Sequence, residues 1–332
     1  MTPWVVWRPM EHRRLGNTDI EVSHVILGCG SFGGIGSAPE FFGQGTPKPE
    51  AFRLMDAAWD AGITTFDTAD AYGGGSSETF IGEWLATKGA AVRDRIVIAT
   101  KTYNAMDDGA DLGLSAARIG RQIDASLTRL GVERVAMYLA HEFDTEVPLE
   151  ETQSAFDELI RVGKIGAAGA SNFTDAQLGA AIDSSERNAQ RRYEWVQNSF
   201  SLLDRGDAGS VLKRCQAEGL GYTPFSPLAG GWLTGKYRRG QAPPAGSRMT
   251  LRPEPYEAYR TDTVFGALEG LEALAVEHGT TMTVLAFSWA LAQPGLTAIV
   301  IGPGRLEHLH PALLAAESPL TPELANHISE LF

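Results

Sequence analysis

Apolar, β-branched runs recur along the chain and alternate with segments whose apolar residues have helical spacing. Most intervals between the runs are about 30 to 40 residues long, and the runs end near Gly28, Asp67, Thr100, Ala140, Ala170, Gln197, Phe225 and Ile301. Continuous apolar runs are typical of parallel strands buried on both faces, with a right-handed helical crossover between them. Eight such units predict a closed α/β barrel, the (β/α)8 or TIM-barrel fold.

Helix boundaries are indicated by capping residues. Between Ser115 and Gly131, which can cap a start and an end, apolar residues recur at spacings of four, four and three, namely Ile119, Ile123, Leu127 and Leu130. Thr174 and Gln177 form a capping-box pattern, and Thr321-Pro322 supplies a cap and a first-turn proline. Each of these signals predicts where a helix of the outer layer begins or ends.

Three long connections interrupt the alternation: residues 33–49, 103–114 and 238–263. They are rich in Gly, Pro and polar residues, so they predict loops and not core elements. Two of them follow strands directly and would overhang the C-terminal end of the barrel, where loops select substrates. Three aromatic residues of these two loops could enclose an apolar substrate, namely Phe41, Phe42 and Tyr103. Phe41 and Phe42 could instead anchor their loop to the barrel.

Four reactive side chains stand at or just past three strand ends. Asp67 ends one apolar run and Tyr72 follows five residues later, while Lys101 and His141 close the next two runs. The C-terminal ends of barrel strands form the active face, so the four side chains are expected to meet there.

These residue types suit the protonation of a carbonyl oxygen while hydride reaches its carbon. Free phenol is a weak acid with a pKa of about 10. Lys101 is expected to lower the pKa of Tyr72, and Asp67 to hold that lysine charged. A neutral His141 would orient the carbonyl oxygen by donating a hydrogen bond.

Five motifs occur in order between about Met10 and about Ala316, and their spacing resembles the aldo-keto reductase superfamily. They are residues 64–73 (TTFDTADAYG), 99–101 (ATK), 169–173 (GASNF), 196–198 with 202–205 (VQN and LLDR), and 225–237 (FSPLAGGWLTGKY). The resemblance implies that Asp67, Tyr72, Lys101 and His141 form a catalytic tetrad, and that the cofactor is NADP(H).

The resemblance also implies which residues surround the nicotinamide. Cys29 and Gly30 would lie beside the cofactor, and Phe225 would stack on its ring. Ser171, Asn172 and Gln197 would hold the carboxamide, since such groups both donate and accept hydrogen bonds. Ser171 and Asn172 could instead only begin a turn.

A second set of residues would bind the phosphates and the adenine end of the cofactor. Backbone amides of a glycine-rich turn can hold a pyrophosphate, and nearby cations add charge. The resemblance to a bacterial branch similar to the potassium-channel β-subunits implies cofactor contact for Lys236 and Arg248, although a lone lysine is usually solvated. The turn residues expected to take part are Ser226, Leu228 and Gly230.

The eighth unit departs from the family pattern. Relatives carry a glutamine at position 308 and an acid followed by asparagine at 311 and 312, whereas this chain has His308 and Pro311-Ala312. Gly304, Arg305 and His308 are therefore expected at an altered adenine site. Arg305 could replace the missing charge, and the choice between NADP and NAD is open.

Two glycine motifs invite a different interpretation. Residues 28–33 match G-x-G-x-x-G after a strand, but about fifteen loop residues follow, so no helix opens to receive a pyrophosphate as a Rossmann site requires. Residues 73–75 could cradle a phosphate, but more simply form the turn that brings Tyr72 into the mouth of the barrel.

Composition narrows the function classes. The chain has 332 residues, 43% of them hydrophobic, and a net charge of −13, which argues against nucleic-acid or anionic-membrane binding. Two cysteines without paired spacing favour a reducing, cytoplasmic setting. The histidines show no metal-ligand spacing, so no metal is expected. We expect a short extension at residues 1–9 and one barrel domain at 10–332.

The expected function is reduction of a small-molecule aldehyde or ketone with NADPH. A nucleotide-sensing partner protein, as the channel β-subunits suggest, is the alternative, because a fold does not fix a function. Reduction of a C=C or C=N bond would use the same cofactor. The sequence leaves the substrate and the oligomeric state open.

Overall fold

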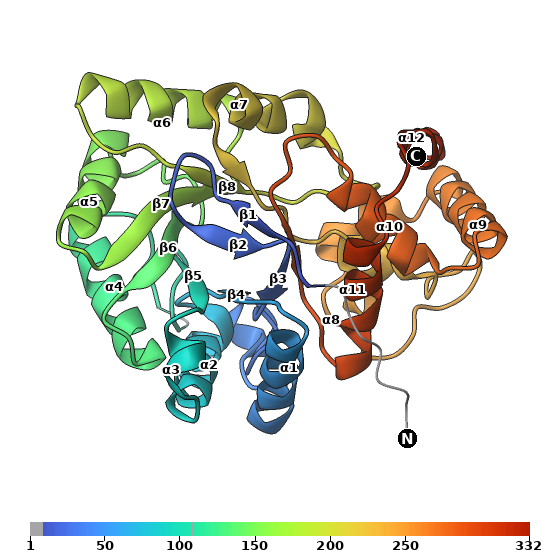
Figure 1. Ribbon diagram of the computed structural model, residues 1–332, viewed down its shortest axis with the longest axis horizontal. Helices are drawn as coiled ribbons and strands as arrows, with labels where there is room; N and C mark the ends of the chain where they lie inside the picture. Colours follow the sequence, from blue (N-terminus) through green and yellow to red (C-terminus); the bar gives the residue numbers. More distant parts are fainter. Residues whose placement is uncertain (1–8, 108) are drawn as a thin grey trace.

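The computed structural model describes residues 9–107 and 109–332, so most of the expected N-terminal extension lies outside the described part. Eight parallel strands stand in the order β10-β3-β4-β5-β6-β7-β8-β9. The two ends of this order also meet, because Thr297 N–H donates to the Tyr222 carbonyl at 2.8 Å and Val300 N–H to the Pro224 carbonyl at 2.9 Å. The predicted (β/α)8 barrel is thus confirmed (Figure 1).

The barrel strands are short, and most end close to the predicted positions. They are β3 Val25–Gly28, β4 Thr65–Asp67, β5 Val97–Thr102, β6 Val135–Ala140, β7 Ile165–Ser171, β8 Trp195–Gln197, β9 Gly221–Tyr222 and β10 Ile299–Ile301. Two ends differ from the prediction. Lys101 lies inside β5, and β9 ends before Phe225, which pairs only with Ser199 in an isolated bridge. Beyond β9, Thr223 N–H still donates to the Val196 carbonyl and Phe225 N–H to the Asn198 carbonyl, both at 3.0 Å.

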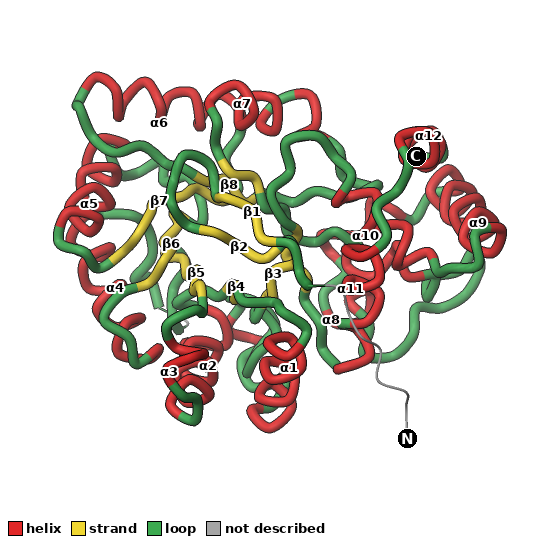
Figure 2. The backbone as a smooth tube through the Cα atoms, viewed as in Figure 1, coloured by secondary structure: helices red, strands yellow, loops and turns green. Residues whose placement is uncertain are grey.

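Helices surround the barrel, and Figure 2 shows them in red outside the yellow strands. The ring consists of α1 Lys48–Asp60, α2 Ser76–Ala86, α4 Ala116–Leu130, α5 Leu149–Arg161, α6 Asp175–Arg187, α7 Val211–Glu218, α10 Met282–Leu291 and α11 His310–Glu317. The remaining helices are α3 Ala90–Arg93, α8 Arg248–Leu251, α9 Asp262–Glu277 and α12 Pro322–Glu330, and α9 and α12 stand outside this ring (Figure 1). No helix of the described residues is long and apolar enough to cross a membrane.

The predicted helix caps are confirmed. The Ser115 side chain accepts a hydrogen bond from the Arg118 N–H, and Gly131 ends α4 at a φ of 66°. The same helix buries Ile119 and Ile123 against the barrel. The capping box of Thr174 and the cap of Thr321 are likewise present. Side-chain acceptors at these positions satisfy amide groups that a helix leaves unpaired.

A hairpin of β1 His12–Arg14 and β2 Glu21–Ser23 was not predicted. It covers the N-terminal end of the barrel, where Ser23 N–H donates to the Thr65 hydroxyl at 3.0 Å and Arg13 donates to the Leu296 carbonyl at 3.0 Å. Strands of three residues are too short to show a reliable alternation in sequence, which explains the omission.

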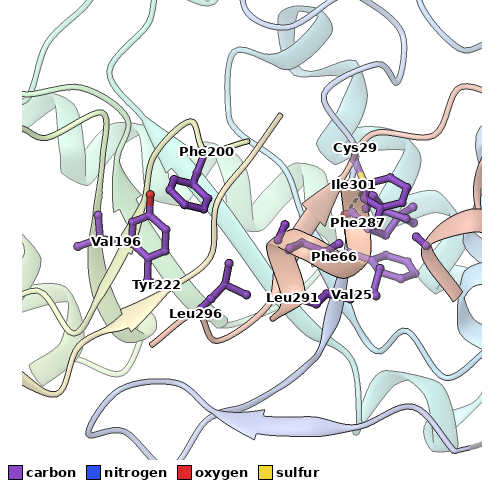
Figure 3. Packing of buried hydrophobic residues seen from close by; sticks show 14 of the residues in the cluster. Val25, Cys29, Phe66, Val196, Phe200, Tyr222, Phe287, Leu291, Leu296 and Ile301 are labelled. Atoms are coloured by element: carbon purple, nitrogen blue, oxygen red, sulfur yellow. Dashed lines mark hydrogen bonds between the residues drawn. The ribbon is translucent and has the colours of Figure 1, made fainter. Parts of the chain in front are cut away.

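Apolar side chains fill both the barrel and the layer around it. The inner cluster consists of Leu15, Val22, Ile26, Ala99, Met137, Leu139, Trp195, Ala298 and Val300. The larger outer cluster joins strands to helices, and Figure 3 shows Phe66 from β4, Phe287 from α10 and Ile301 from β10 within it. The hairpin covers one end of this filled barrel, so a site has room at the other, C-terminal end.

The loop of residues 33–49 folds back on itself at that C-terminal end. Gly33 N–H donates to the Thr46 carbonyl at 3.0 Å, Thr46 N–H donates to the Ser31 carbonyl at 2.6 Å, and Gly43 N–H donates to the Gly33 carbonyl at 2.7 Å. The next α-helix begins only at Lys48. No helix therefore opens at the G-x-G-x-x-G motif, which agrees with the rejection of a Rossmann site.

Candidate active site

A buried ion pair lies at the C-terminal end of the barrel. Lys101 Nζ donates to Asp67 Oδ2 at 2.7 Å and to the Thr68 carbonyl oxygen at 2.8 Å. The Lys101 side chain is completely buried, and that of Asp67 is 5% exposed. Adjacent strands β4 and β5 place these residues side by side, because Asp67 pairs in register with Ala99. Burying both charges requires that they stay paired.

Tyr72 and His141 complete the group of four. The Tyr72 hydroxyl lies 3.4 Å from His141 Nε2, and Lys101 Nζ lies 5.1 Å from the centroid of the Tyr72 ring. Residues 73–75 turn the chain sharply after Tyr72, with φ of 58°, 64° and 91°. Only glycine adopts such angles readily three times in succession. The glycine run therefore acts as the turn that positions Tyr72, as the sequence indicated.

Burial keeps Tyr72 protonated. Burial raises the pKa of Tyr72, Asp67 raises it further, and the lowering by Lys101 does not compensate. Lys101 thus lowers the pKa of Tyr72, as expected, but burial outweighs this effect and the pKa stays above its ordinary value. Burial alone would lower the pKa of Lys101, but Asp67 and Tyr72 outweigh it and raise that pKa. Burial and Lys101 lower the pKa of His141 well below its ordinary value. A phenol, an ammonium and a neutral imidazole result.

Two polar residues at this end were missed in the sequence. Asn104 Nδ2 lies 3.2 Å from His141 Nδ1, and Glu142 Oε1 accepts a hydrogen bond from Asn172 Nδ2 at 3.0 Å. Burial raises the pKa of Glu142 to about 7 despite that hydrogen bond. Both residues follow a strand end by two positions, which is the signal that could have drawn attention to them.

The three residues expected to hold the carboxamide lie together at the ends of β7 and β8. Gln197 Nε2 donates to Asp67 Oδ1 at 3.0 Å, so this amide also fixes the buried carboxylate. Asn172 has a φ of 60° and donates through Nδ2 to the His141 carbonyl at 2.9 Å. Ser171 is buried at the last position of β7. The acceptor oxygens of Asn172 and Gln197 have no hydrogen-bond partner among the described residues.

The residues expected beside the nicotinamide ring differ in what they can offer. A Cβ at Gly30 would lie 3.4 Å from the Tyr72 ring, so the glycine keeps space open beside the phenol. The Cys29 side chain instead packs in the outer apolar cluster (Figure 3), and only its backbone can face the mouth. Phe225 is half-buried against the inner cluster.

The glycine-rich turn after β9 has an unusual backbone. Ser226 has a φ of 56°, Gly230 of 64° and Gly231 of 93°, and Leu228 precedes the short helical turn Ala229–Thr234. A Cβ on Gly230 would collide with the ring of Tyr256, and one on Gly231 with the Lys236 ammonium. Glycine is therefore required for the turn to approach these side chains closely.

Two cations lie beside this turn without a carboxylate partner among the described residues, namely Lys236 and Arg248. Burial and then the charge of Arg248 lower the pKa of Lys236. Burial lowers the pKa of Arg248 as well. The Ser247 hydroxyl next to Arg248 is buried without a hydrogen-bond partner. An exposed lysine, a half-buried arginine and an unpartnered hydroxyl fit an anionic group such as a nucleotide phosphate.

The altered eighth unit lies near these cations. Burial lowers the pKa of His308, and the charges of Arg305 and Lys236 lower it further against the influence of Glu307. The Gly304 N–H donates to His308 Nδ1 at 3.3 Å. Arg305 Nη1 lies 3.6 Å from Glu307 Oε1, and both side chains are largely exposed. Arg305 thus has a weak internal partner, unlike Lys236 and Arg248.

The three aromatic residues predicted for a substrate pocket occupy two loops over the mouth. The Phe42 ring lies against Gly74, so it packs on the turn that carries Tyr72. Phe41 is half-buried in the same loop. Tyr103 is half-buried in the second loop, where burial, Asp144 and Glu142 raise its pKa.

No group of three or more His, Cys, Asp or Glu side chains that could hold a metal ion occurs within residues 9–107 and 109–332. The two cysteines are free and buried.

The structure thus combines a closed (β/α)8 barrel with a buried Asp–Lys pair, a protonated tyrosine and a neutral histidine at the C-terminal end of the barrel. The family model described as Aldo/keto reductase family matches residues 24–332. The chain therefore belongs to the aldo/keto reductase family, an oxidoreductase family that uses nicotinamide cofactors.

Individual relatives agree with this assignment. The chain is 35% identical to an uncharacterized oxidoreductase of Bacillus subtilis (strain 168), YrpG, over 97% of this chain and 96% of the relative. It is 30% identical to versiconal hemiacetal acetate reductase of Aspergillus parasiticus, over 97% and 96%. It is 32% identical to L-glyceraldehyde 3-phosphate reductase of Escherichia coli (strain K12), over 90% and 86%.

Proposed function

We propose that this protein reduces an aldehyde or ketone to the alcohol with NADPH, in a reversible reaction in which Tyr72 donates the proton. The observation that carries the proposal is the hydroxyl of Tyr72 lying 3.4 Å from His141 Nε2, above a buried Lys101–Asp67 pair. A hydroxyl donor and an imidazole donor so placed can converge on one carbonyl oxygen.

Each of the four side chains at the mouth of the barrel has a defined role in the proposed reaction. His141 donates from Nε2 to the carbonyl oxygen and orients it. Tyr72 transfers its proton to that oxygen as negative charge develops there, and Lys101 stabilises the phenolate that remains. Asp67 keeps Lys101 charged, because an isolated ammonium in a buried site would lose its proton. Solvent then returns a proton to Tyr72.

The cofactor, when bound, supplies the hydride. Ser171, Asn172 and Gln197 would hold its carboxamide, and Phe225 with the Gly30 backbone would border its ring. The glycine turn at Ser226, Leu228 and Gly230 would approach the pyrophosphate through backbone amides. Lys236 and Arg248, with Gly304, Arg305 and His308 nearby, would face the adenosine end.

We propose NADPH over NADH because of the charge at that end. Charge-assisted hydrogen bonds contribute about 1.5 to 3 kcal/mol, against about 1 for neutral ones. The two cations should therefore outweigh the lost adenine contacts at positions 308, 311 and 312. The expected preference in kcat/KM is at least about tenfold, or about 1.4 kcal/mol.

The substrate is proposed to be a small-molecule carbonyl compound. The relatives are named as reductases or oxidoreductases, so the comparisons do not favour the alternative of a partner-binding nucleotide sensor. The net charge of −13 speaks against a nucleic-acid or anionic-membrane partner, and the two free cysteines are consistent with a cytoplasmic setting.

The decisive experiment uses the purified protein with NADPH deuterated at the transferring position of the nicotinamide. A panel of aliphatic, aromatic, sugar and polycyclic carbonyls is tested, with a nitrobenzaldehyde as the simple reference. Loss of reduced nicotinamide absorbance with deuterium on the carbinol carbon is the expected result. No turnover of any carbonyl, combined with reduction of a C=C or C=N compound, would contradict the proposal.

A further inference from the structure

The side chain that contacts the second nitrogen of His141 is Asn104. Its Nδ2 lies 3.2 Å from His141 Nδ1, while the opposite nitrogen, Nε2, lies 3.4 Å from the Tyr72 hydroxyl. An amide nitrogen only donates hydrogen bonds, so Nδ1 must be the acceptor and carry no proton. In a neutral imidazole the single proton is then on Nε2, on the side of Tyr72.

The position of Asn104 is itself fixed by a buried arginine of α4. Arg118, which is 2% exposed, donates through Nη2 to the Asn104 carbonyl at 2.7 Å. Its Nη1 donates to the Gly113 carbonyl at 3.1 Å and to the Thr102 hydroxyl at 2.9 Å. The start and the end of the 103–114 loop are therefore held by one guanidinium. A connected path runs from α4 through Asn104 to His141.

We propose that Asn104 is a positioning residue that holds His141 in its Nε2–H tautomer, so that this imidazole donates a hydrogen bond toward the mouth. The inference rests on the proposed function, because that function requires a donor at Nε2. Without the amide donor, a neutral His141 has no group that selects between its two tautomers on the Nδ1 side.

Several charged or titratable residues lie on the segments around His141. They come from β4, the turn after it, β5 and the segment after β6: Asp67, Tyr72, Lys101, Glu142 and Asp144. Of these, Lys101 acts on the pKa of His141 in the same direction as burial, which lowers it. The ring is therefore neutral at physiological pH, and its tautomer decides whether Nε2 can donate.

Two variants of nearly equal size test the inference. Asn104→Asp replaces the donor by an acceptor, so the carboxylate draws the proton of a neutral His141 to Nδ1 and leaves Nε2 bare. We expect kcat at pH 8 to fall by about 100-fold, the loss typical of removing one donor to a developing oxyanion. Asn104→Leu removes the hydrogen-bond donor to Nδ1 without putting an acceptor in its place, and we expect kcat to fall by less than about tenfold. Asn17→Asp, an exposed residue at the other end of the barrel, is the matched control and should retain its kcat.

The pH profile separates this role from a packing role. The carboxylate in Asn104→Asp raises the pKa of His141, and the doubly protonated ring again carries a proton on Nε2. The kcat of Asn104→Asp should therefore rise as the pH falls through that raised pKa, whereas the wild type and Asn104→Leu show no such rise. Equal losses in both variants, without this rise, would indicate packing alone and overturn the proposal.

A direct measurement does not depend on turnover. The 15N chemical shifts of His141, assigned by comparison with His141→Gln, should show a bare Nδ1 and a protonated Nε2 in the wild type and the reverse in neutral Asn104→Asp. A protonated Nδ1 in the wild type overturns the inference. If no carbonyl is reduced by the wild type, the proposed function fails, while this measurement still decides the tautomer.

Discussion

The two ends of the proposed cofactor site differ in how their charges are satisfied. At the chemical end, Lys101 lies 2.7 Å from Asp67, whose other oxygen accepts from Gln197 at 3.0 Å. At the phosphate end, Lys236 and Arg248 have no carboxylate partner among the described residues, and Arg248 adds to the lowering of the Lys236 pKa. The charges at the chemical end are thus paired within the protein, whereas the two cations at the phosphate end can still accept an anionic partner.

This contrast assigns different tasks to the two ends. Groups that are already paired and oriented need no rearrangement when charge develops in the reaction, so they favour catalysis. Cations that repel each other gain most when an anion arrives, so they favour binding and cofactor choice. Substitutions at the chemical end should therefore change kcat, and those at the phosphate end should change cofactor affinity.

The largest effect is expected for Tyr72→Phe. This change removes the proton donor but keeps the ring, so kcat should fall at least about 100-fold while NADPH affinity stays nearly constant. Steady-state rates and quenching of protein fluorescence by NADPH check the two quantities. Tyr193→Phe is the control, because Tyr193 packs against Phe156, away from the mouth of the barrel, and its buried hydroxyl has no hydrogen-bond partner. Near-normal turnover of Tyr72→Phe would remove Tyr72 from the mechanism.

A smaller effect, confined to cofactor choice, is expected for Arg248→Ala. Loss of one partner of the 2'-phosphate should reduce the preference for NADPH over NADH by about tenfold in kcat/KM. Maximal rates should change little. Arg161→Ala, which removes an exposed arginine at the far end of α5, should leave the preference unchanged. Better use of NADH than of NADPH by the unmodified protein would contradict the proposed role of both cations.

Tyr103→Ala tests whether a loop side chain at the chemical end contacts the substrate. Tyr103 belongs to a loop over the mouth, so its removal should raise KM for bulky aromatic carbonyls about fivefold, through loss of about 1 kcal/mol of contact. A small aliphatic aldehyde is the internal control and should show little change. Unchanged KM and kcat for both substrates would exclude Tyr103 from the pocket.

The smallest effect is expected for Arg305→Ala. Arg305 is exposed and lies 3.6 Å from Glu307, and exposed ion pairs contribute about 0 to 1 kcal/mol. The NADPH preference should therefore change by less than about threefold. Both variants should be measured in the same assay. A larger loss of NADPH preference in Arg305→Ala than in Arg248→Ala would show that Arg305 of the eighth unit supplies the main positive charge for the 2'-phosphate.

Much of the site followed from sequence because its residues are tied to strand ends. Asp67, Lys101 and His141 each lie within two residues of the end of a barrel strand, and such residues must share one face of a barrel. The glycine run after Tyr72 likewise specified a turn, because its backbone angles admit few other residues. Asn104 could not be found in this way, since its contact with His141 depends on how a loop folds across two strands.

The sequence by itself indicated the barrel and its crossover order through the alternation of apolar runs with segments of helical spacing, and the helix caps through polar and glycine residues, because these signals lie in residues close together in the chain. The tertiary structure alone decided the direction of the Tyr72 pKa, the partner of Gln197 and the absence of an internal anion beside Lys236 and Arg248 among the described residues. These properties depend on burial and on charges brought together from distant segments, which no local pattern encodes.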